Sequence, residues 1–486
     1  MLLLHLFEYD RAAVAFKRAE TLDPQFAMAY WGEAMTATHP VWDQQNIEAG
    51  RATLARLAPT PEARAAKAPT EREKAFLGIT EILYGEGSKP ERDRRVAEAM
   101  EAMAKQFPDD DEVQLFLSLA LLGKTEGVRD LPNFLRAAEL AKAAYRRNPQ
   151  HPGAAHYWIH GMDDPANASG ALEAAHALSK IAPGAGHAQH MTSHIFMALG
   201  MWDEVVASNE AAERVSTDEL HAEGRPPMTC GHYAEWLQYA YFQQGRERDG
   251  YQILATCQRE GRAAVAWLRQ HPDNPAAKLR PPAALKARID ESLVGMRAVT
   301  IVESPRFRRQ AATMDIDVSD IGRANGWALF SRGLEQAWRG DVGAASRALA
   351  ALRVIAAQPD EPGDDAHTGA YLTLMSQMLE GAIAQRQGHG DRAVQLATSA
   401  ALAYEAIPFD FGPPVPVKPP REFLGELLLA AGRPQEALAA FDQALQTAPK
   451  RALSLAGRAR AAANSGSASR APARHRNSRH RDRHRT

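Results

Sequence analysis

The stretch AAGRPQEALAAFDQALQTAP, residues 430–449, indicates the fold class through the spacing of its small and bulky residues. After Gly432 come Ala437, Phe441, Ala444 and Pro449, at offsets of 5, 9, 12 and 17 residues. Residues three and four apart share one face of a helix, so the two alanines and the phenylalanine form a single stripe. The glycine is placed to end the preceding helix, and the proline to stop the helix that carries the stripe.

The same spacing recurs along the chain. Copies read DRAAVAFKRAETLDP, FLRAAELAKAAYRRNP, SGALEAAHALSKIAP and LGMWDEVVASNEAAE, and weaker copies follow Gly245, Gly340 and Gly388. The pattern resembles the tetratricopeptide repeat over roughly two thirds of the chain. The resemblance implies an all-α fold, an α-solenoid of stacked antiparallel helix pairs. It also implies a right-handed superhelix whose concave groove is built mainly from the first helix of each pair.

Composition fits a globular helical protein without a membrane span. Hydrophobic residues make up 45% and charged residues 24% of the 486-residue chain, and no apolar run approaches the length needed to cross a bilayer. Two cysteines, Cys230 and Cys257, are too few for a disulfide framework and leave the redox compartment open. The chain as it stands is expected to be soluble and cytoplasmic, with any export signal lying upstream.

The repeat pattern suggests a division of the chain. The first repeat is expected to be truncated, because only eight residues precede Tyr9. A Pro-rich stretch at 408–423 is expected to be an ordered loop. The expected parts are N-terminal repeats at 1–133, central His-rich repeats at 134–250, an irregular helical connection at 251–325, C-terminal repeats at 326–462 and a disordered basic tail at 463–486.

Charge argues against a nucleic-acid-binding domain. The formal net charge is −2, but the last 17 residues carry seven arginines against one aspartate, so the remainder of the chain sums to −8. An acidic body with a short basic end lacks the basic surface that nucleic acids require. We expect no nucleic-acid partner apart from contacts of the tail.

Histidines are concentrated in the central repeats. Nine of the 17 lie within residues 151–232, where even placement gives about three. On a helix, His156 and His160 lie about 40° apart, and the three histidines of GHAQHMTSH (186–194) fall within about 60°. In a third segment, His232 and Glu235 repeat the spacing of the first two histidines of that motif.

The family resemblance implies that these positions look into the groove, where neighbouring first helices lie on the order of 10 Å apart. The candidate site therefore comprises His156, His160, Asp163, Asp164, His187, His190, His194, His232 and Glu235.

Clustered imidazoles stay neutral because like charges disfavour protonation, and neutral imidazole is a good ligand for Zn, Fe or Cu. The carboxylates would complete such a site or orient its ligands. No nucleotide-binding motif is present, so no nucleotide cofactor is expected. Simpler roles remain open: the histidines as hydrogen-bonding groups inside the solenoid, His151 as part of a turn, Trp31, Trp42 and Trp202 as core residues, and Glu422 and Glu426 as a solvated face.

Two functions remain open. In the first, the solenoid binds a protein, peptide or small-molecule ligand in its concave groove, with a transition metal held by the histidine and carboxylate cluster. In the second, the groove is the active site of a metal-dependent enzyme of oxygenase or hydrolase type. Grooves that bind peptides usually carry Lys, Arg or Asn at these positions, so histidine and carboxylate favour metal binding or chemistry. The family resemblance favours the first function, because most repeats of this kind act as scaffolds.

Overall fold

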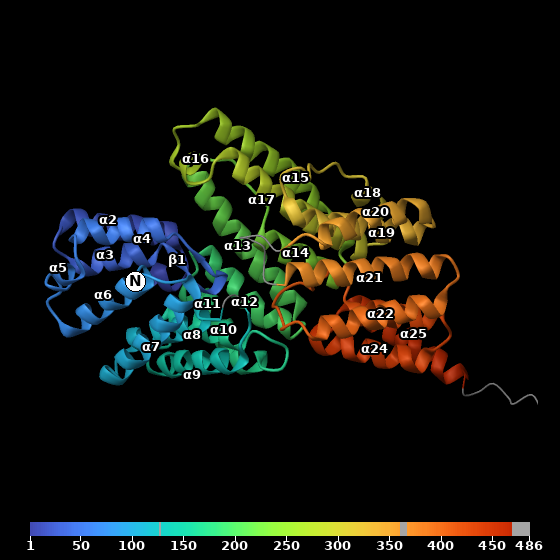
Figure 1. Ribbon diagram of the computed structural model, residues 1–486, viewed down its shortest axis with the longest axis horizontal. Helices are drawn as coiled ribbons and strands as arrows, with labels where there is room; N and C mark the ends of the chain where they lie inside the picture. Colours follow the sequence, from blue (N-terminus) through green and yellow to red (C-terminus); the bar gives the residue numbers. More distant parts are fainter. Residues whose placement is uncertain (126–127, 360–366, 469–486) are drawn as a thin grey trace, which may run out of the picture.

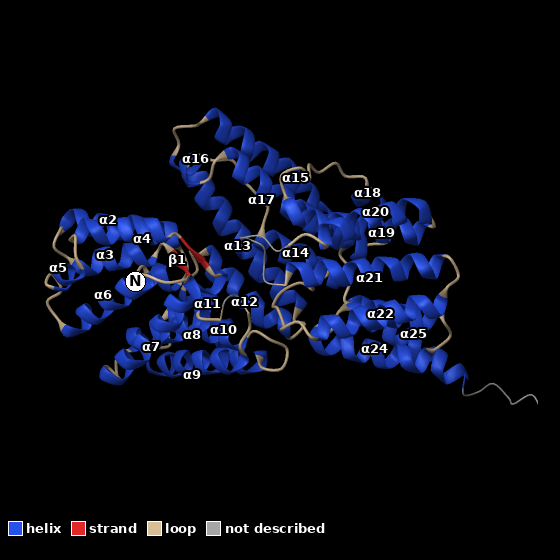
Figure 2. Ribbon diagram, viewed as in Figure 1, coloured by secondary structure: helices blue, strands red, loops and turns tan. Residues whose placement is uncertain are grey.

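The computed structural model describes residues 1–125, 128–359 and 367–468. It is 75% helix and 1% strand, which confirms the all-α class. Figure 2 shows the helices in blue and one short antiparallel strand pair in red. This pair joins β1 (Thr38–His39) to β2 (Gln44–Gln45).

The helices follow one another along the chain with short connections (Figure 1). The N-terminal part contains α1 (Leu2–His5), α2 (Tyr9–Leu22), α3 (Ala27–Met35), η1 (Pro40–Trp42), α4 (Ile47–Leu57), α5 (Pro61–Ala65), α6 (Glu71–Leu83), α7 (Lys89–Gln106), α8 (Asp111–Gly123) and α9 (Leu131–Arg147). The central part contains α10 (Pro152–Met162), η2 (Ala168–Ala171), α11 (Leu172–Ile181), α12 (Gly186–Ala198), α13 (Trp202–Ala222), α14 (His232–Gln243), α15 (Glu247–Gln270), α16 (Pro275–Leu279), α17 (Pro282–Glu303) and α18 (Arg308–Ala312). The C-terminal part contains η3 (Gly322–Ala324), α19 (Asn325–Arg339), α20 (Val342–Ala356), α21 (Thr368–Arg386), α22 (Gly390–Glu405), α23 (Pro420–Ala430), α24 (Pro434–Thr447) and α25 (Ala452–Ala468).

Helix packing follows the repeat. Nearly every helix packs on its neighbour in the chain, as α9 does on α10 and α12 on α13. Alternate helices also touch: α8 contacts α10, α10 contacts α12, and α19, α21, α23 and α25 form a second such series. Each pair thus stacks on the next through its first helix, which is the arrangement expected of the solenoid.

The spacing of the repeat stripe explains this packing. Ala437, Phe441 and Ala444 are all buried between helices. The glycines that precede the stripes, at 200, 245, 340, 388 and 432, have φ values between +63° and +93°. Glycine adopts this left-handed conformation without a steric cost, so it ends one helix and allows the chain to turn into the next.

The apolar core forms three clusters. One runs from Leu4 to Tyr241, a second covers residues 234–328, and a third covers 330–461. The first cluster is continuous across the expected boundary at 133, and the expected irregular connection contains two long helices, α15 and α17. The division into five parts stays a prediction.

The segment that leads into α25 contacts the central helices. Trp202 Nε1 donates to the Lys450 carbonyl (3.2 Å), and the Ala452 N–H donates to Gln243 Oε1 (2.9 Å). Residues 463–468 of the predicted tail continue α25, and 469–486 lie outside the described residues. Within the described ranges, every helix is too short or too polar to traverse a lipid bilayer.

Candidate metal centre

Successive first helices bring six histidines together. Helix α10 carries His156 and His160, and α14 begins at His232. Helix α12 carries the three histidines of the GHAQHMTSH motif. The nitrogens form two groups in which all ligand atoms lie within 4.8 Å of one another. We name these the first histidine group (His156, His160 and His187) and the second histidine group (His190, His194 and His232).

In the first histidine group, three Nε2 atoms converge. His156 Nε2 lies 3.0 Å from His160 Nε2 and 3.2 Å from His187 Nε2. The other ring nitrogen of His156, Nδ1, donates to the main-chain carbonyl of His5 (2.7 Å). A carbonyl only accepts, so in the neutral ring Nε2 carries the lone pair and faces its two neighbours.

In the second histidine group, two rings are oriented in the same way. His190 Nδ1 donates to Asn209 Oδ1 (2.7 Å), and His194 Nδ1 donates to Asp163 Oδ2 (2.5 Å). Their Nε2 atoms face each other at 3.1 Å. The exposed ring of His232 packs 4.5 Å from the ring of His190, measured between centroids.

The two groups are adjacent. Ring centroids lie 6.0 Å apart between His160 and His194, and 6.3 Å apart between His187 and His190. Burial lowers the pKa of His156 to about 3 and holds the pKa of His160 and His190 well below the usual value. Repulsion from neighbouring imidazoles lowers the pKa of the last two further. The rings of His156, His160 and His190 are therefore neutral near pH 7.

Three aromatic side chains from distant segments cover the rings. Phe7 packs 4.5 Å from His156, Trp42 packs 5.6 Å from His187, and Phe411 packs 5.1 Å from His194, all between ring centroids. Trp42 is 41% exposed, so the expectation that it is a core residue was wrong. His156, His187 and His194 are thus covered by side chains from the N-terminal part and from the loop between α22 and α23.

A small cavity, of about 40 Å³, opens beside the second histidine group. His194 and Asp163 form part of its wall. The Pro-rich loop between α22 and α23 forms another part of the wall, and α23 begins after it at Pro420. This cavity therefore borders the second histidine group.

Of the predicted carboxylates, only Asp163 contacts an imidazole. Asp164 pairs with Arg129 (2.6 Å) and accepts from the Ala166 and Asn167 N–H groups, which places it in a turn. Glu235 accepts from Ser292 Oγ on α17. The structure therefore does not direct these two carboxylates toward the rings, and whether any predicted residue ligates a metal stays a prediction.

A further group escaped the sequence analysis. His5 and His151 both contact Glu112, at 2.7 and 3.3 Å, and the ligand atoms of all three lie close together. His151 also accepts from the Ala154 N–H (3.3 Å) and so caps α10, which agrees with its predicted place in a turn. His5 lies outside the repeat register, and Glu112 is far in sequence from both histidines, so spacing gave no signal for either.

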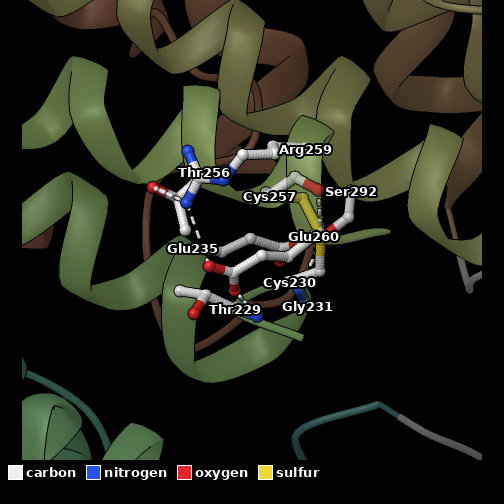
Figure 3. Close-up of a disulfide and its surroundings, with 9 residues drawn as sticks. All are labelled: Thr229, Cys230, Gly231, Glu235, Thr256, Cys257, Arg259, Glu260 and Ser292. Atoms are coloured by element: carbon white, nitrogen blue, oxygen red, sulfur yellow. Dashed lines mark hydrogen bonds and ion pairs between the residues drawn. A yellow bond between two sulfur atoms is a disulfide. The ribbon is translucent and has the colours of Figure 1, made fainter. Parts of the chain in front are cut away.

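The two cysteines, which sequence alone left unassigned, form a disulfide (Figure 3). Cys230 lies two residues before His232, and Cys257 lies on α15. Around the bridge, the Thr229 N–H donates to Glu260 (3.0 Å) and the Gly231 N–H to Ser292 Oγ (3.0 Å). These contacts anchor the segment that delivers His232.

The expectation of a solvated face at Glu422 was wrong. Its side chain is fully buried and accepts from Arg451 Nε (2.8 Å) and Lys418 Nζ (2.9 Å). Lys418 also bridges to Glu426 (2.6 Å). The cations at this site are the protein's own side chains.

Comparisons with known proteins give only distant structural matches. No family model matches the chain, and no curated protein is detectably similar in sequence. Solved structures with a related arrangement include yeast Tom70, with TM-score 0.31 and 11% identity over 96% of this chain and 87% of that chain. Others are the Cut9–Hcn1 hetero-tetramer of the APC/C, with TM-score 0.35 and 9% identity over 94% and 74%, and the human IFIT1 dimer with m7Gppp-AAAA, with TM-score 0.36 and 12% identity over 83% and 87%.

All three are tetratricopeptide-repeat proteins. At TM-scores of this size, the assignment rests on this chain's own repeat spacing and helix pairing. The fold is a tetratricopeptide-like solenoid.

Proposed function

We propose that this solenoid binds transition-metal ions, one at each histidine group, and uses them to bind a small ligand that enters through the adjacent cavity. The observation that carries the proposal is the pair of Nε2 atoms of His190 and His194, 3.1 Å apart. Each ring already donates its Nδ1 hydrogen to an oxygen, Asn209 Oδ1 in one case and Asp163 Oδ2 in the other.

The positions of the ring hydrogens explain why the facing Nε2 atoms of His190 and His194 favour a cation between them. The Asn209 amide is oriented by its donation to the Val205 carbonyl (2.8 Å), so its oxygen faces His190 and must accept. With both rings neutral, two lone pairs face each other without a hydrogen between them. A hydrogen on His190 Nε2 would remove the conflict, but burial opposes the charge that this ring would then carry. A metal ion bound by both lone pairs removes it while leaving both rings neutral.

The distances fit shared ligation. Two ligand nitrogens in a tetrahedral zinc site, each at about 2.0–2.1 Å from the metal, are separated by about 3.3 Å. The separations of 3.0–3.2 Å among the Nε2 atoms are close to this value. Asp163, Asn209 and the His5 carbonyl would orient the ligands by accepting from Nδ1, as outer-shell oxygens do in known metal sites.

The group formed by His5, Glu112 and His151 differs from the two histidine groups in its hydrogen bonding. His5 accepts at Nδ1 from the Tyr157 hydroxyl (3.0 Å) and donates from Nε2 to Glu112. His151 accepts at Nδ1 and donates from Nε2 to the same carboxylate. Every nitrogen here has a complementary partner, so protons alone complete the network. We therefore do not include this group among the metal sites.

Elemental analysis of the protein, purified without a histidine tag, tests the proposal. We expect two equivalents of transition metal per chain, one lost in His156→Ala and the other in His190→Ala. His176→Ala is the matched control, because this exposed histidine of α11 lies in neither group. It should keep both equivalents. The proposal fails if metal-free protein takes up no added Zn, Fe, Cu or Ni.

An enzyme is the second candidate, and the ligand number favours it. Three histidines per ion leave coordination positions open, as in catalytic zinc sites and in non-haem iron enzymes. The cavity beside His194 would bring a substrate to such a position. Cobalt-substituted protein should then change its visible spectrum when azide is added. An unchanged spectrum would restrict the ions to a structural role.

A further inference from the structure

The two histidine groups differ in how open they are to solvent. All three histidines of the first histidine group are buried, whereas His232 of the second histidine group is exposed. The small cavity beside the centre is lined by His194 and by no residue of the first histidine group. Among the described residues, the first histidine group is thus the closed member of the pair.

Phe7 packs against every ring of the first histidine group. Its ring centroid lies 4.5, 5.7 and 5.5 Å from those of His156, His160 and His187. The phenyl side chain is itself 6% exposed, and the Trp42 ring packs edge-on against it. A single ring that contacts three ligands lies near the axis of the group, where a water molecule would have to bind as a fourth ligand.

The backbone at Phe7 supports a specific role for this ring. Its φ is +57°, a left-handed conformation that a bulky residue rarely adopts. The Phe7 N–H donates to the Leu4 carbonyl (3.1 Å), so the turn between α1 and α2 holds the residue in place. Unfavourable backbone conformations of this kind are concentrated at functional sites.

The first histidine group also lacks a counter-charge. Asp163 contacts His194 of the second histidine group (2.5 Å), but no ion pair within the described ranges joins a carboxylate to a ring of the first. Glu8 contacts the main chain of His187, and burial raises the pKa of this carboxyl, which disfavours its negative charge. Because the cost of burying an ion rises with the square of its charge, the site favours a monovalent ion.

From the closure and the charge we propose that the first histidine group is a three-coordinate copper(I) site sealed by Phe7, and that ligand exchange is confined to the second. This inference rests on the metal binding proposed above and names the ion at one of the two groups. Zinc(II) sites in proteins almost always have four ligands, whereas copper(I) is stable with three. Imidazole is a suitable ligand for copper.

Metal competition in full-length single-site variants tests the proposal. His190→Ala removes a ligand from the second histidine group, and His156→Ala removes one from the first. Zn(II) and, without oxygen, Cu(I) are titrated against chelators. We expect the preference for Cu(I) over Zn(II) to be at least about tenfold larger in His190→Ala than in His156→Ala, because zinc at the first histidine group lacks its fourth ligand.

X-ray absorption of Cu(I)-loaded His190→Ala should show three nitrogen ligands. A fourth ligand, or equal preferences in the two variants, would overturn the copper(I) assignment while the metal binding itself stood. Uptake of neither ion by His190→Ala would refute both proposals at this group.

Phe7→Ala, made in the His190→Ala chain, tests the seal. Removing the phenyl ring admits water as a fourth ligand, so we expect zinc affinity at the first histidine group to rise about tenfold. Phe411→Ala in the same chain is the control, because Phe411 packs on His194, and it should leave that affinity unchanged. An unchanged zinc affinity in Phe7→Ala would refute the seal. The comparison of His190→Ala with His156→Ala needs no change at Phe7, so it decides the proposal even if Phe7→Ala does not fold.

Discussion

At the scale of single residues, three of the six imidazoles take their orientation from an oxygen that the Nδ1 atom contacts. His156 is oriented by the His5 carbonyl, His190 by Asn209 and His194 by Asp163. Each contact turns Nε2 toward the neighbouring histidines. The oxygens therefore determine the geometry of the proposed centre as much as the histidines do.

Asp163→Asn tests this orientation. The substitution keeps the shape of the side chain but removes the charge that His194 Nδ1 contacts, so we expect zinc affinity at the second histidine group to fall about 10- to 100-fold. Competition with a chelator measures the change. Asp164→Asn is the control, because that carboxylate pairs with Arg129, and its affinity should stay within about twofold. Equal losses in the two variants would argue against the assigned role of Asp163.

Glu213, on α13, should make stability depend on pH. Burial raises its pKa from 4.5 to about 8, with a smaller contribution from Glu260. Between these values the carboxyl ionises in the unfolded chain but stays protonated in the folded one, so stability falls as pH rises from about 4.5 to 8. Glu213→Gln should flatten this part of the melting-temperature profile. A profile identical to that of the wild type would show that the carboxyl is ionised in the folded protein.

Sequence spacing predicted which histidines would meet, because helical periodicity and the repeat register depend only on neighbours in the chain. It did not predict which carboxylates would join them. Asp164 and Glu235 turn away to Arg129 and Ser292, which belong to other elements. The same limit concealed Glu112, whose histidine partners lie at positions 5 and 151.

At the scale of elements, the start of α14 is held by a covalent tie. The Cys230–Cys257 disulfide joins the segment before this helix to α15, two residues from His232. Gly231 adds a hydrogen bond to Ser292. The repeat glycines predicted where helices end, but nothing in the spacing of two cysteines 27 residues apart indicated that they would meet.

Removing the disulfide should affect the two histidine groups unequally. In a Cys230→Ser/Cys257→Ser variant we expect the free energy of unfolding to fall by about 2–4 kcal/mol, since the unfolded chain loses a constraint. Metal affinity should decrease at the second histidine group, which contains His232, and stay unchanged at the first. Denaturant titration and metal competition measure these effects. An unchanged metal affinity at the second histidine group, or an equal loss at both groups, would contradict the proposed link.

At the scale of the whole molecule, the C-terminal helix pairs are joined to the central helices through one buried arginine. Arg451, at the start of α25, is fully buried and contacts Glu303 of α17 (2.6 Å), Glu422 of α23 (2.8 Å) and the Tyr239 hydroxyl of α14 (3.1 Å). Helix pairs far apart in the sequence are therefore joined through one guanidinium group. Ordinary repeat arrays contact only their neighbours, so this chain should unfold more cooperatively than they do.

Arg451→Met tests that connection. Loss of the guanidinium leaves two buried carboxylates without their shared cation, so we expect destabilisation of about 3–5 kcal/mol. Calorimetry should also show the C-terminal helix pairs melting before the rest. Arg458→Met is the control, because this exposed arginine of α25 pairs with exposed Asp442 and should change stability by less than about 1 kcal/mol. A single transition with unchanged stability in Arg451→Met would contradict the assigned role.

The loop that carries Phe411 restricts how such a protein can evolve. Open repeat arrays gain or lose copies freely, because each added unit disturbs only the units beside it. Here Phe411 reaches His194 from more than 200 positions away. An extra helix pair inserted between them would displace the loop by about 10 Å, the spacing of packed helices. Descendants that keep the six histidines should therefore also keep the number of intervening helix pairs.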